Sequence, residues 1–266
     1  MDHATDAVTD PVYASLLAAA FLAGGIDAMV GGGGLIQLPA LFAALPAAPP
    51  PMLLGTSKLA GLAGTAGAAF RYARSVQLPW RRLLPAAGVA FATALAGAVT
   101  VSYVSPLIFR PLVPVMLTLV LIYTLAHKEL GRVHRPRELG PRATLVGGAA
   151  VGAIGFYDGF FGPGTGSFLM LLFIRYYGFD FLNAAAAARM INVATNAAAL
   201  AWFGSRGYLI WPLGLSMALA NVAGAQVGTR LALRRGAGFV RGVFVLIVGA
   251  LIARTGWVAL QSLRPV

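Results

Sequence analysis

Residues 24–34 read GGIDAMVGGGG and residues 155–166 read GFYDGFFGPGTG, so an acid followed by a glycine cluster occurs twice in the chain. The two acids, Asp27 and Asp158, are 131 positions apart, and the same offset relates other residues of matching type. The further pairs are Gly24 and Gly155, Gly31 and Gly162, Gly33 and Gly164, Lys58 and Arg189, Trp80 and Trp211, Gly97 and Gly228, and Arg110 and Arg241. One register that joins an acid, a glycine turn, a cation and a tryptophan indicates a duplicated unit. We therefore predict that the two halves of the chain fold alike and share one site.

The composition is that of a membrane protein. Apolar residues make up 59% of the chain and charged residues 11%, with a mean hydropathy of +0.80. A soluble domain carries roughly 25% charged residues, so this chain requires lipid as part of its solvent. Its apolar runs are long and rich in Ala, Leu and Gly, whereas a barrel needs short alternating segments of about ten residues. We therefore predict an all-α polytopic membrane protein.

Each half is expected to hold about five hydrophobic segments. Their approximate ranges are 12–30, 35–48, 53–70, 83–104 and 107–126 in the first half, and 143–160, 166–178, 182–203, 208–229 and 240–257 in the second. The second segment of each half is shorter than the roughly 20 residues that cross a bilayer, so it either spans or forms a re-entrant hairpin with its predecessor. The expected organisation is a tail (1–11), a first repeat (12–126), a basic linker (127–142), a second repeat (143–260) and a tail (261–266).

The basic residues predict the orientation. If the N-terminus is extracytoplasmic, the arginine-rich stretches 71–82, 127–142 and 230–241 all fall on the cytoplasmic side, as the positive-inside rule requires. The loop before Trp80 is rich in arginine, whereas the loop before Trp211 holds only Arg206. Charge density thus changes sides between the halves. This predicts repeats of inverted topology, joined by a cytoplasmic linker.

Several function classes are excluded or disfavoured. The chain has no Cys, which excludes thiolate metal sites and cysteine nucleophiles. Its histidines, His3, His127 and His134, lie in the tail and the central linker, so we expect neither an enzyme active site nor a metal or cofactor site within the segments. The net charge of +12 is explained by cytoplasmic loops, and no nucleic-acid partner is expected.

The glycine clusters allow two interpretations. Such runs break a helix and leave backbone N–H groups free, and a helix that starts after the break directs its positive dipole end at the gap, which suits an anion. Alternatively, glycines serve close helix packing. On the first interpretation the candidate ligand-binding positions are Gly31, Gly32, Gly33, Gly162, Gly164 and Thr165.

A cation follows each intramembrane acid by 31 positions: Lys58 after Asp27 and Arg189 after Asp158. Buried charges are costly unless they are paired or hydrated. One interpretation is a structural ion pair within each half, Asp27 with Lys58 and Asp158 with Arg189. The other is a binding site for a small oxyanion, in which the two cations act together, the two acids serve in proton coupling, and neutral donors complete the site. These donors are Thr56, Ser57, Thr65, Asn192 and Asn196.

The same residues carry a resemblance to a known family. The elements GIDAMVGGGGL (25–35), LPAL (38–41), GTSK (55–58), GFYDGFFGPGTG (155–166) and RMIN (189–192), with Asn196, resemble the TauE/SafE sulfite exporter family over nearly the whole chain. The resemblance implies a multi-pass protein of the bacterial inner membrane that transports sulfite or an organosulfonate such as sulfoacetate. Gly61 and Thr65 stand where the second half has Asn192 and Asn196, so the binding surface is asymmetric.

The expected function is therefore export of a small sulfur-containing anion by a secondary transporter that works by alternating access. Its expected partners are that anion and the lipid bilayer, and a homodimer is left open. The alternative is a cation- or proton-coupled carrier, or a channel, for another small solute that uses Asp27 and Asp158.

Overall fold

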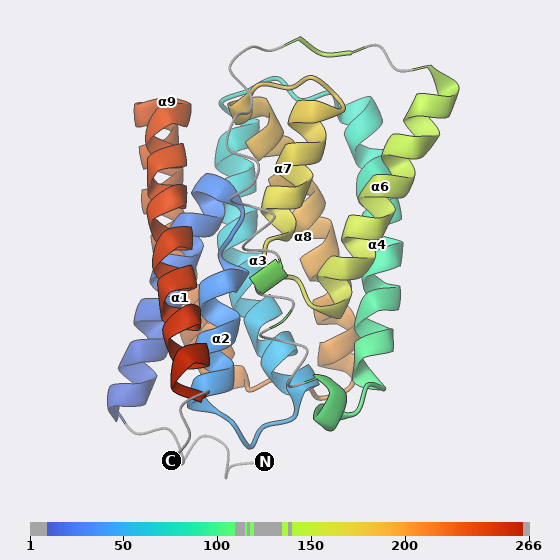
Figure 1. The fold of residues 1–266 in the computed structure, drawn as a ribbon. Coiled ribbons are helices and arrows are strands. Elements are labelled where there is room, and N and C mark those ends of the chain that lie inside the picture. Colours follow the sequence, from blue (N-terminus) through green and yellow to red (C-terminus); the bar gives the residue numbers. More distant parts are fainter. Residues whose placement is uncertain (1–9, 110–114, 116–117, 120–134, 138–139, 263–266) are drawn as a thin grey trace.

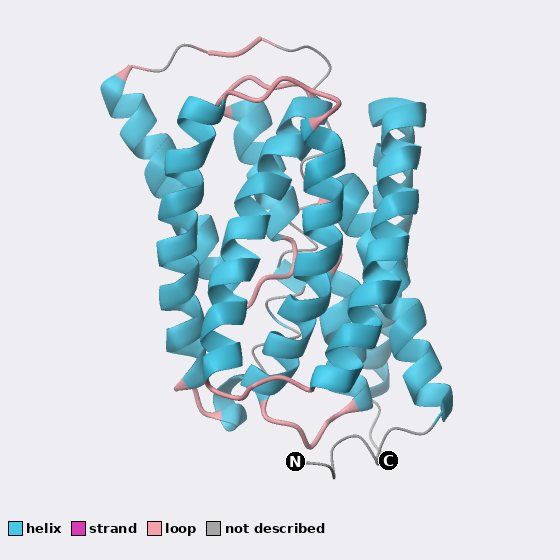
Figure 2. Ribbon diagram, turned by 180° about the vertical axis from the view of Figure 1, so that it is seen from behind, coloured by secondary structure: helices cyan, strands magenta, loops and turns pink. Residues whose placement is uncertain are grey.

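The computed structural model describes residues 10–109, 115, 118–119, 135–137 and 140–262, and its elements there are helices (Figures 1 and 2). They are α1 (Asp10–Val30), α2 (Gly34–Ala44), α3 (Pro50–Ala73), α4 (Trp80–Ser102), α6 (Pro141–Phe160), α7 (Thr165–Arg175), α8 (Phe181–Ser205) and α9 (Trp211–Ser262). Ala and Leu, which dominate these segments, are among the strongest helix formers. The prediction of an all-α chain is confirmed for the described residues, which contain no strand.

Within the described part of the chain, three helices are long and apolar enough to cross a membrane: Pro11–Val30, Trp80–Ser102 and Pro141–Phe160. Large apolar side chains on these helices are exposed, among them Leu22, Leu84 and Leu145. A surface of this kind is stable next to acyl chains, because lipid replaces the water that such side chains would otherwise order. The bundle thus has the apolar exterior of a membrane protein.

The helices α2 and α7 have 11 residues each, which is about 16 Å of helix and about half of a 30 Å hydrocarbon core. Each follows a break after a longer helix, and in Figure 1 α2 occupies the lower half of the bundle while α7 occupies the upper half. The breaks depend on glycine, because Gly31, Gly162 and Gly164 have φ angles of 79°, 100° and 83°. Two half-length helices therefore start near the middle of the bundle.

The long helices pack through glycine. Helix α1 lies along α9 and α4 lies along α6, while α3 packs on α8 and α9, and α8 also packs on α4. A Cβ atom at Gly224 in α9 would lie 1.8 Å from the Phe21 carbonyl oxygen in α1, and one at Gly97 in α4 would lie 2.1 Å from the Phe156 carbonyl oxygen in α6. In both pairs the backbones touch directly, as small residues allow in membranes.

One predicted boundary is not marked by a break in the helix. From the sequence we expect two segments, 208–229 and 240–257, separated by a basic loop at 230–241. Helix α9 is continuous over 52 residues and includes that stretch, but its C-terminal end lies back at the lower end of the bundle in Figure 1, so the chain turns within it. The basic stretch contains Leu, Ala and Arg, which favour helix, and Gly236 and Gly238 alone do not end it. The predicted segment 107–126, the linker 127–142 and the terminal tails lie largely outside the described residues.

We predict that Gly97→Ala destabilises the protein by roughly 1–3 kcal/mol, because its Cβ would overlap the Phe156 carbonyl oxygen and force α4 away from α6. Gly88→Ala is the matched control on the same helix, since a Cβ there has no atom within 4 Å. It should keep or slightly raise the thermal unfolding midpoint in detergent. Equal midpoints for the two variants would contradict this packing.

Candidate functional site

The two helix breaks meet at the centre of the bundle. A Cβ atom at Gly31 would lie 2.3 Å from the carbonyl carbon of Gly166, and one at Gly34 would lie 3.0 Å from the Cα of Pro163. The Ser167 hydroxyl also donates a hydrogen bond to the Val30 carbonyl oxygen at 2.8 Å. Glycine here serves both interpretations made from the sequence, because it lets the two breaks touch and also opens each helix.

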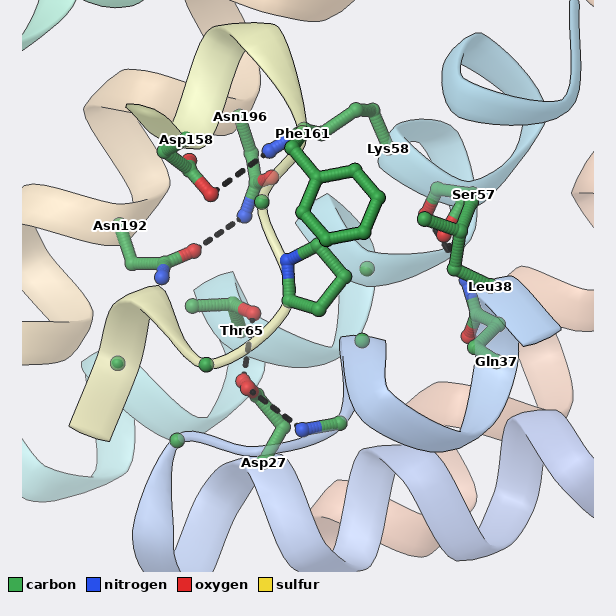
Figure 3. A pocket seen from close by; sticks show the side chains of 18 of the residues that line it. Asp27, Gln37, Leu38, Ser57, Lys58, Thr65, Asp158, Phe161, Asn192 and Asn196 are labelled. Atoms are coloured by element: carbon green, nitrogen blue, oxygen red, sulfur yellow. Dashed lines mark hydrogen bonds and ion pairs between the residues drawn. The ribbon is translucent and has the colours of Figure 1, made fainter. Parts of the chain in front are cut away.

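A cavity of about 60 Å³ lies at this junction (Figure 3). Eleven of the candidate residues line it: Asp27, Gly31, Gly33, Ser57, Lys58, Thr65, Asp158, Gly162, Gly164, Asn192 and Asn196. They come from both halves of the chain, through the two breaks and the helices α3 and α8. The structure therefore brings most of the predicted positions together around one space.

An ion pair crosses the cavity between the halves. The Lys58 ammonium lies 2.8 Å from the Asp158 Oδ1 atom, and the two residues are only 7% and 2% exposed. A Cβ atom at Gly162 would lie 2.9 Å from the Lys58 Nζ atom, so this pair occupies the space that the glycine leaves. The other oxygen of Asp158 is buried and has no hydrogen-bond partner in the described part of the chain.

This pairing differs from both ion pairs considered from the sequence. The Asp27 carboxylate accepts a hydrogen bond from the Thr65 hydroxyl at 3.0 Å and a longer one from the Gly33 N–H at 3.4 Å. With neutral donors around Asp27, Lys58 is directed at the acid of the opposite half. The interpretation of one ion pair within each half is thus wrong for this structure, because the contacts cross.

Arg189 lies beside the cavity and outside its lining. Its guanidinium donates to the main-chain oxygen of Asp27, to the Ala185 carbonyl oxygen at 3.1 Å and to the Met170 sulfur at 3.2 Å. Its carbon also lies 5.7 Å from the centre of the Tyr72 ring. The Asp27 carbonyl oxygen also accepts from the Gly31 N–H at 2.8 Å, so the guanidinium adds a second bond at the C-terminal end of α1, where the helix dipole favours a cation. Arg189 therefore holds the first helix break in place from the second half of the chain.

An amide network completes one wall. The Gln37 amide donates to the main-chain oxygen of Ser57 at 2.9 Å and to its hydroxyl at 3.0 Å, and accepts a hydrogen bond from the Asn221 amide at 3.0 Å. On another wall the Asn196 amide donates to the Asn192 side-chain oxygen at 2.5 Å. These bonds orient the amides and leave other polar positions of the wall available to a ligand.

Sequence reasoning missed Gln37 and Asn221, although both line the cavity. The 131-position offset relates them to Phe168 and Ala90, so the duplication does not mark them. Each could be recognised as a single amide side chain within an apolar segment, because a polar side chain in a membrane needs a hydrogen-bond partner.

Three further candidates lie outside the cavity lining, as Arg189 does: Gly32, Thr56 and Thr165. The Thr56 hydroxyl donates to the Met52 carbonyl oxygen at 2.8 Å and accepts from the Ile210 N–H at 3.0 Å. The Thr165 hydroxyl donates to the Gly162 carbonyl oxygen at 2.7 Å. Both hydroxyls thus stabilise the surrounding backbone. Among the described residues, no three His, Cys, Asp or Glu side chains gather as metal ligands.

The arrangement of the cavity suits a small, strongly hydrogen-bonding ion. It combines one ammonium group, two carboxylates, amide groups and the main chain of the glycine breaks around one space. None of these groups is an activated nucleophile with an oriented base, which acyl or phosphoryl transfer would require. The arrangement can bind and release a polar solute near the middle of the bundle.

Comparison with known proteins agrees with this description. Residues 16–255 match the family model described as sulfite exporter TauE/SafE. A Sinorhizobium protein named probable membrane transporter protein ORF9 is 38% identical, with 91% of this chain and 92% of the relative covered. The probable membrane transporter protein YfcA of Escherichia coli K12 is 35% identical (88% and 86% covered), and a probable membrane transporter protein of Haemophilus influenzae is 32% identical (92% and 96%).

No solved structure matches the chain significantly. The family match covers most of the chain, and each alignment with a relative covers most of that relative's length as well. The expectation of a multi-pass membrane transporter, and not an enzyme, is confirmed by these matches. This chain belongs to the TauE/SafE sulfite exporter family.

Proposed function

We propose that this protein exports a small sulfur-containing anion, sulfite or an organosulfonate such as sulfoacetate, by alternating access. The observation that carries the proposal is the buried Lys58 ammonium at a cavity lined by amides, hydroxyls and two glycine breaks. The description of the matching family points to the same substrate class. The site we propose centres on Lys58, with Asn192, Asn196 and the glycine breaks as neutral donors.

The size of the cavity supports a small substrate. One water needs roughly 10–15 Å³ by this measure, so about 60 Å³ holds a compact oxyanion or a few waters. An ammonium group offers three donors to the oxygens of such an ion. The helices α2 and α7 begin at the cavity, so their N–H groups and dipoles add to the attraction for an anion.

Binding of an anion at Lys58 requires Asp158 to give up its contact, because the carboxylate occupies one side of the ammonium group. We assign a coupling role to Asp158 on this ground. A proton taken up at Asp158 would remove its charge, free Lys58 for the substrate and lower the repulsion between the carboxylate and the anion. Asp27, held by Thr65 and Gly33, is the corresponding group of the first half.

Inverted repeats supply the route to alternating access. The 131-position offset relates α1 to α6, α3 to α8 and α4 to the start of α9. Under that relation, the contact of α1 with α9 in one half corresponds to the contact of α6 with α4 in the other. In the same way, the contact of α3 with α9 corresponds to that of α8 with α4. An inversion of one half relative to the other also accounts for the placement of α2 and α7 in opposite halves of the bundle in Figure 1. Transporters of this kind bind substrate near the midplane where broken helices meet.

The position of the arginines supports the orientation that we infer, with the N-terminus outside the bacterial inner membrane. The end of α3 carries Arg71 and Arg74, the start of α4 carries Arg81 and Arg82, and α7 ends at Arg175. These ends lie together at the upper end of the bundle in Figure 1. The positive-inside rule assigns that end to the cytoplasm.

A cation carrier that uses Asp27 and Asp158 is the competing function. Asp27 already accepts a hydrogen bond from Thr65, and Asp158 is paired with Lys58. A cation would have to displace these donors. The Lys58 ammonium group, 2.8 Å from Asp158, would also repel a cation bound at that carboxylate. The described contacts therefore favour an anion.

The ion pair predicts a stability cycle. Lys58→Gln should lower the stability by about 3–5 kcal/mol, because it leaves the buried Asp158 charge without a partner. The double variant Lys58→Gln/Asp158→Asn removes both charges and should recover most of that loss. Unfolding midpoints in detergent measure both effects. A single variant as stable as the native chain would show that the pair is not buried as described.

The double variant also tests transport. Purified protein in liposomes should move radiolabelled sulfite, with sulfate, thiosulfate and sulfoacetate as competitors and with an imposed pH gradient. Because Lys58→Gln/Asp158→Asn is expected to fold but lacks the ammonium group, its flux should fall at least tenfold, whereas Arg71→Gln, which removes a charge that does not line the cavity, should keep the native rate. Native flux in the double variant would overturn this site. Cation flux, with none for any anion, would favour the competing function.

A further inference from the structure

A second cavity, of about 520 Å³, lies where α4 and α6 begin. Its lining comes from residues 77–79, the first three turns of α4, the first two turns of α6, the end of α7 with the turn that follows it, the start of α8, and residues 136–137. In Figure 1 this is the upper end of the bundle, well away from the central breaks. A volume of this size is within the range of pockets that hold organic ligands, about 300–1,000 Å³.

The lining has two kinds of surface. Its apolar part, which we call the apolar wall, includes Leu83, Phe173 and Phe179, all of which are buried. The lining also includes Arg81 and Arg82, and none of its described residues carries a carboxylate. The nearby acid Asp180 is engaged in capping α8, where it accepts from the Asn183 main chain and side chain.

A third arginine, Arg137, is fixed at the rim of the same cavity by its backbone. The Arg137 N–H donates to the Tyr177 carbonyl oxygen at 3.0 Å, and the Arg135 N–H donates to the Gly178 carbonyl oxygen at 2.9 Å. Two consecutive bonds of this kind tie residues 135–137 to the end of α7. Among the residues that the structure describes, the lining therefore includes three arginines and no acid.

The surroundings place this cavity at the surface of the bilayer. Next to the lining residues in the sequence, Leu84, Leu145 and Val146 are exposed, as side chains that face acyl chains are. Trp80, at the start of α4, is half exposed, and tryptophan is typical of the boundary between acyl chains and head groups. A ligand in this position meets hydrocarbon on one side and charged head groups on the other.

We propose that this cavity binds an anionic phospholipid. The phosphate would contact Arg81, Arg82 and Arg137, because guanidinium groups bind phosphate oxygens in pairs, and the N-terminal ends of α4 and α6 add favourable dipoles. The glycerol and the first part of an acyl chain would contact the apolar wall. A soluble phosphate would leave that wall in contact with water, so the combination of walls selects an amphiphile. Basic pockets between membrane helices are suited to anionic head groups.

Because α4 and α6 come from different halves of the chain, a lipid seated between their first turns would stabilise the contact between the halves at this end. The inference is independent of the substrate in the central cavity. It makes the lipid composition of the membrane a factor in the stability of the bundle.

Native mass spectrometry of the full-length protein, titrated in detergent with phosphatidylglycerol or phosphatidylcholine, tests this inference. We expect one phosphatidylglycerol to bind at least tenfold more tightly than phosphatidylcholine. The variant Arg81→Gln/Arg82→Gln should reduce that preference about tenfold or more, since each basic group near a membrane surface contributes about one factor of five in affinity. Gly148→Leu should weaken both lipids, because it fills a position of the cavity at which a Cβ meets no atom within 4 Å.

Matched controls separate this site from general charge and packing effects. Arg71→Gln/Arg74→Gln removes two charges at the same end of the bundle, and Gly88→Leu enlarges an open position on α4 outside the lining. Both should keep native lipid binding. An unchanged preference in Arg81→Gln/Arg82→Gln, or an equal loss in the controls, would overturn the inference. Displacement of the lipid by glycerol phosphate at equal concentration would do so as well, since it would identify a soluble anion as the ligand.

Discussion

The ion pair between Lys58 and Asp158 is the interaction on which the centre of this protein depends. Two charges this deeply buried are tolerable only when they meet, since either one alone would carry a desolvation cost of several kcal/mol. The helix α3 must therefore stay within reach of the end of α6. Gly162 makes that approach feasible, because a side chain at this position would collide with the ammonium group. The glycine break, the cavity and the contact between the halves thus all follow from the need to keep these two buried charges together.

Much of the site could be predicted from the sequence, because charges and helix breaks within apolar segments are rare enough to be recognised. Asp27, Lys58 and Asp158 were found in this way, and all three line the cavity. The offset between the halves could not show which acid meets which cation, since it relates Asp27 to Asp158 and Lys58 to Arg189 and says nothing of the distance between an acid and a cation in the folded chain. Gln37 and Asn221 were missed because they have no counterpart in the other half.

The fold was predicted at the level of segments and less well at their ends. The starts of α3 and α6 lie two or three residues from the expected positions, because apolar runs and helices coincide there. Helical hydrogen bonding continues through the basic stretch after the expected segment 208–229, since a change from apolar to basic residues marks a change of environment and does not by itself stop a helix. Hydropathy reports what surrounds a helix, and hydrogen bonding decides where the helix ends.

The contacts between glycines and carbonyl oxygens determine which parts of the molecule can move as rigid bodies. In α1 and α9, Gly24 faces the Asn221 oxygen and Gly224 faces the Phe21 oxygen, and α4 and α6 are joined in the same manner. Each joined pair takes one helix from each half of the sequence. Interfaces of this closeness resist sliding, because any shift brings backbone atoms into collision. Under the proposed alternating access, the moving bodies would be these two mixed pairs, and the hinges would fall at the glycine breaks that follow α1 and α6.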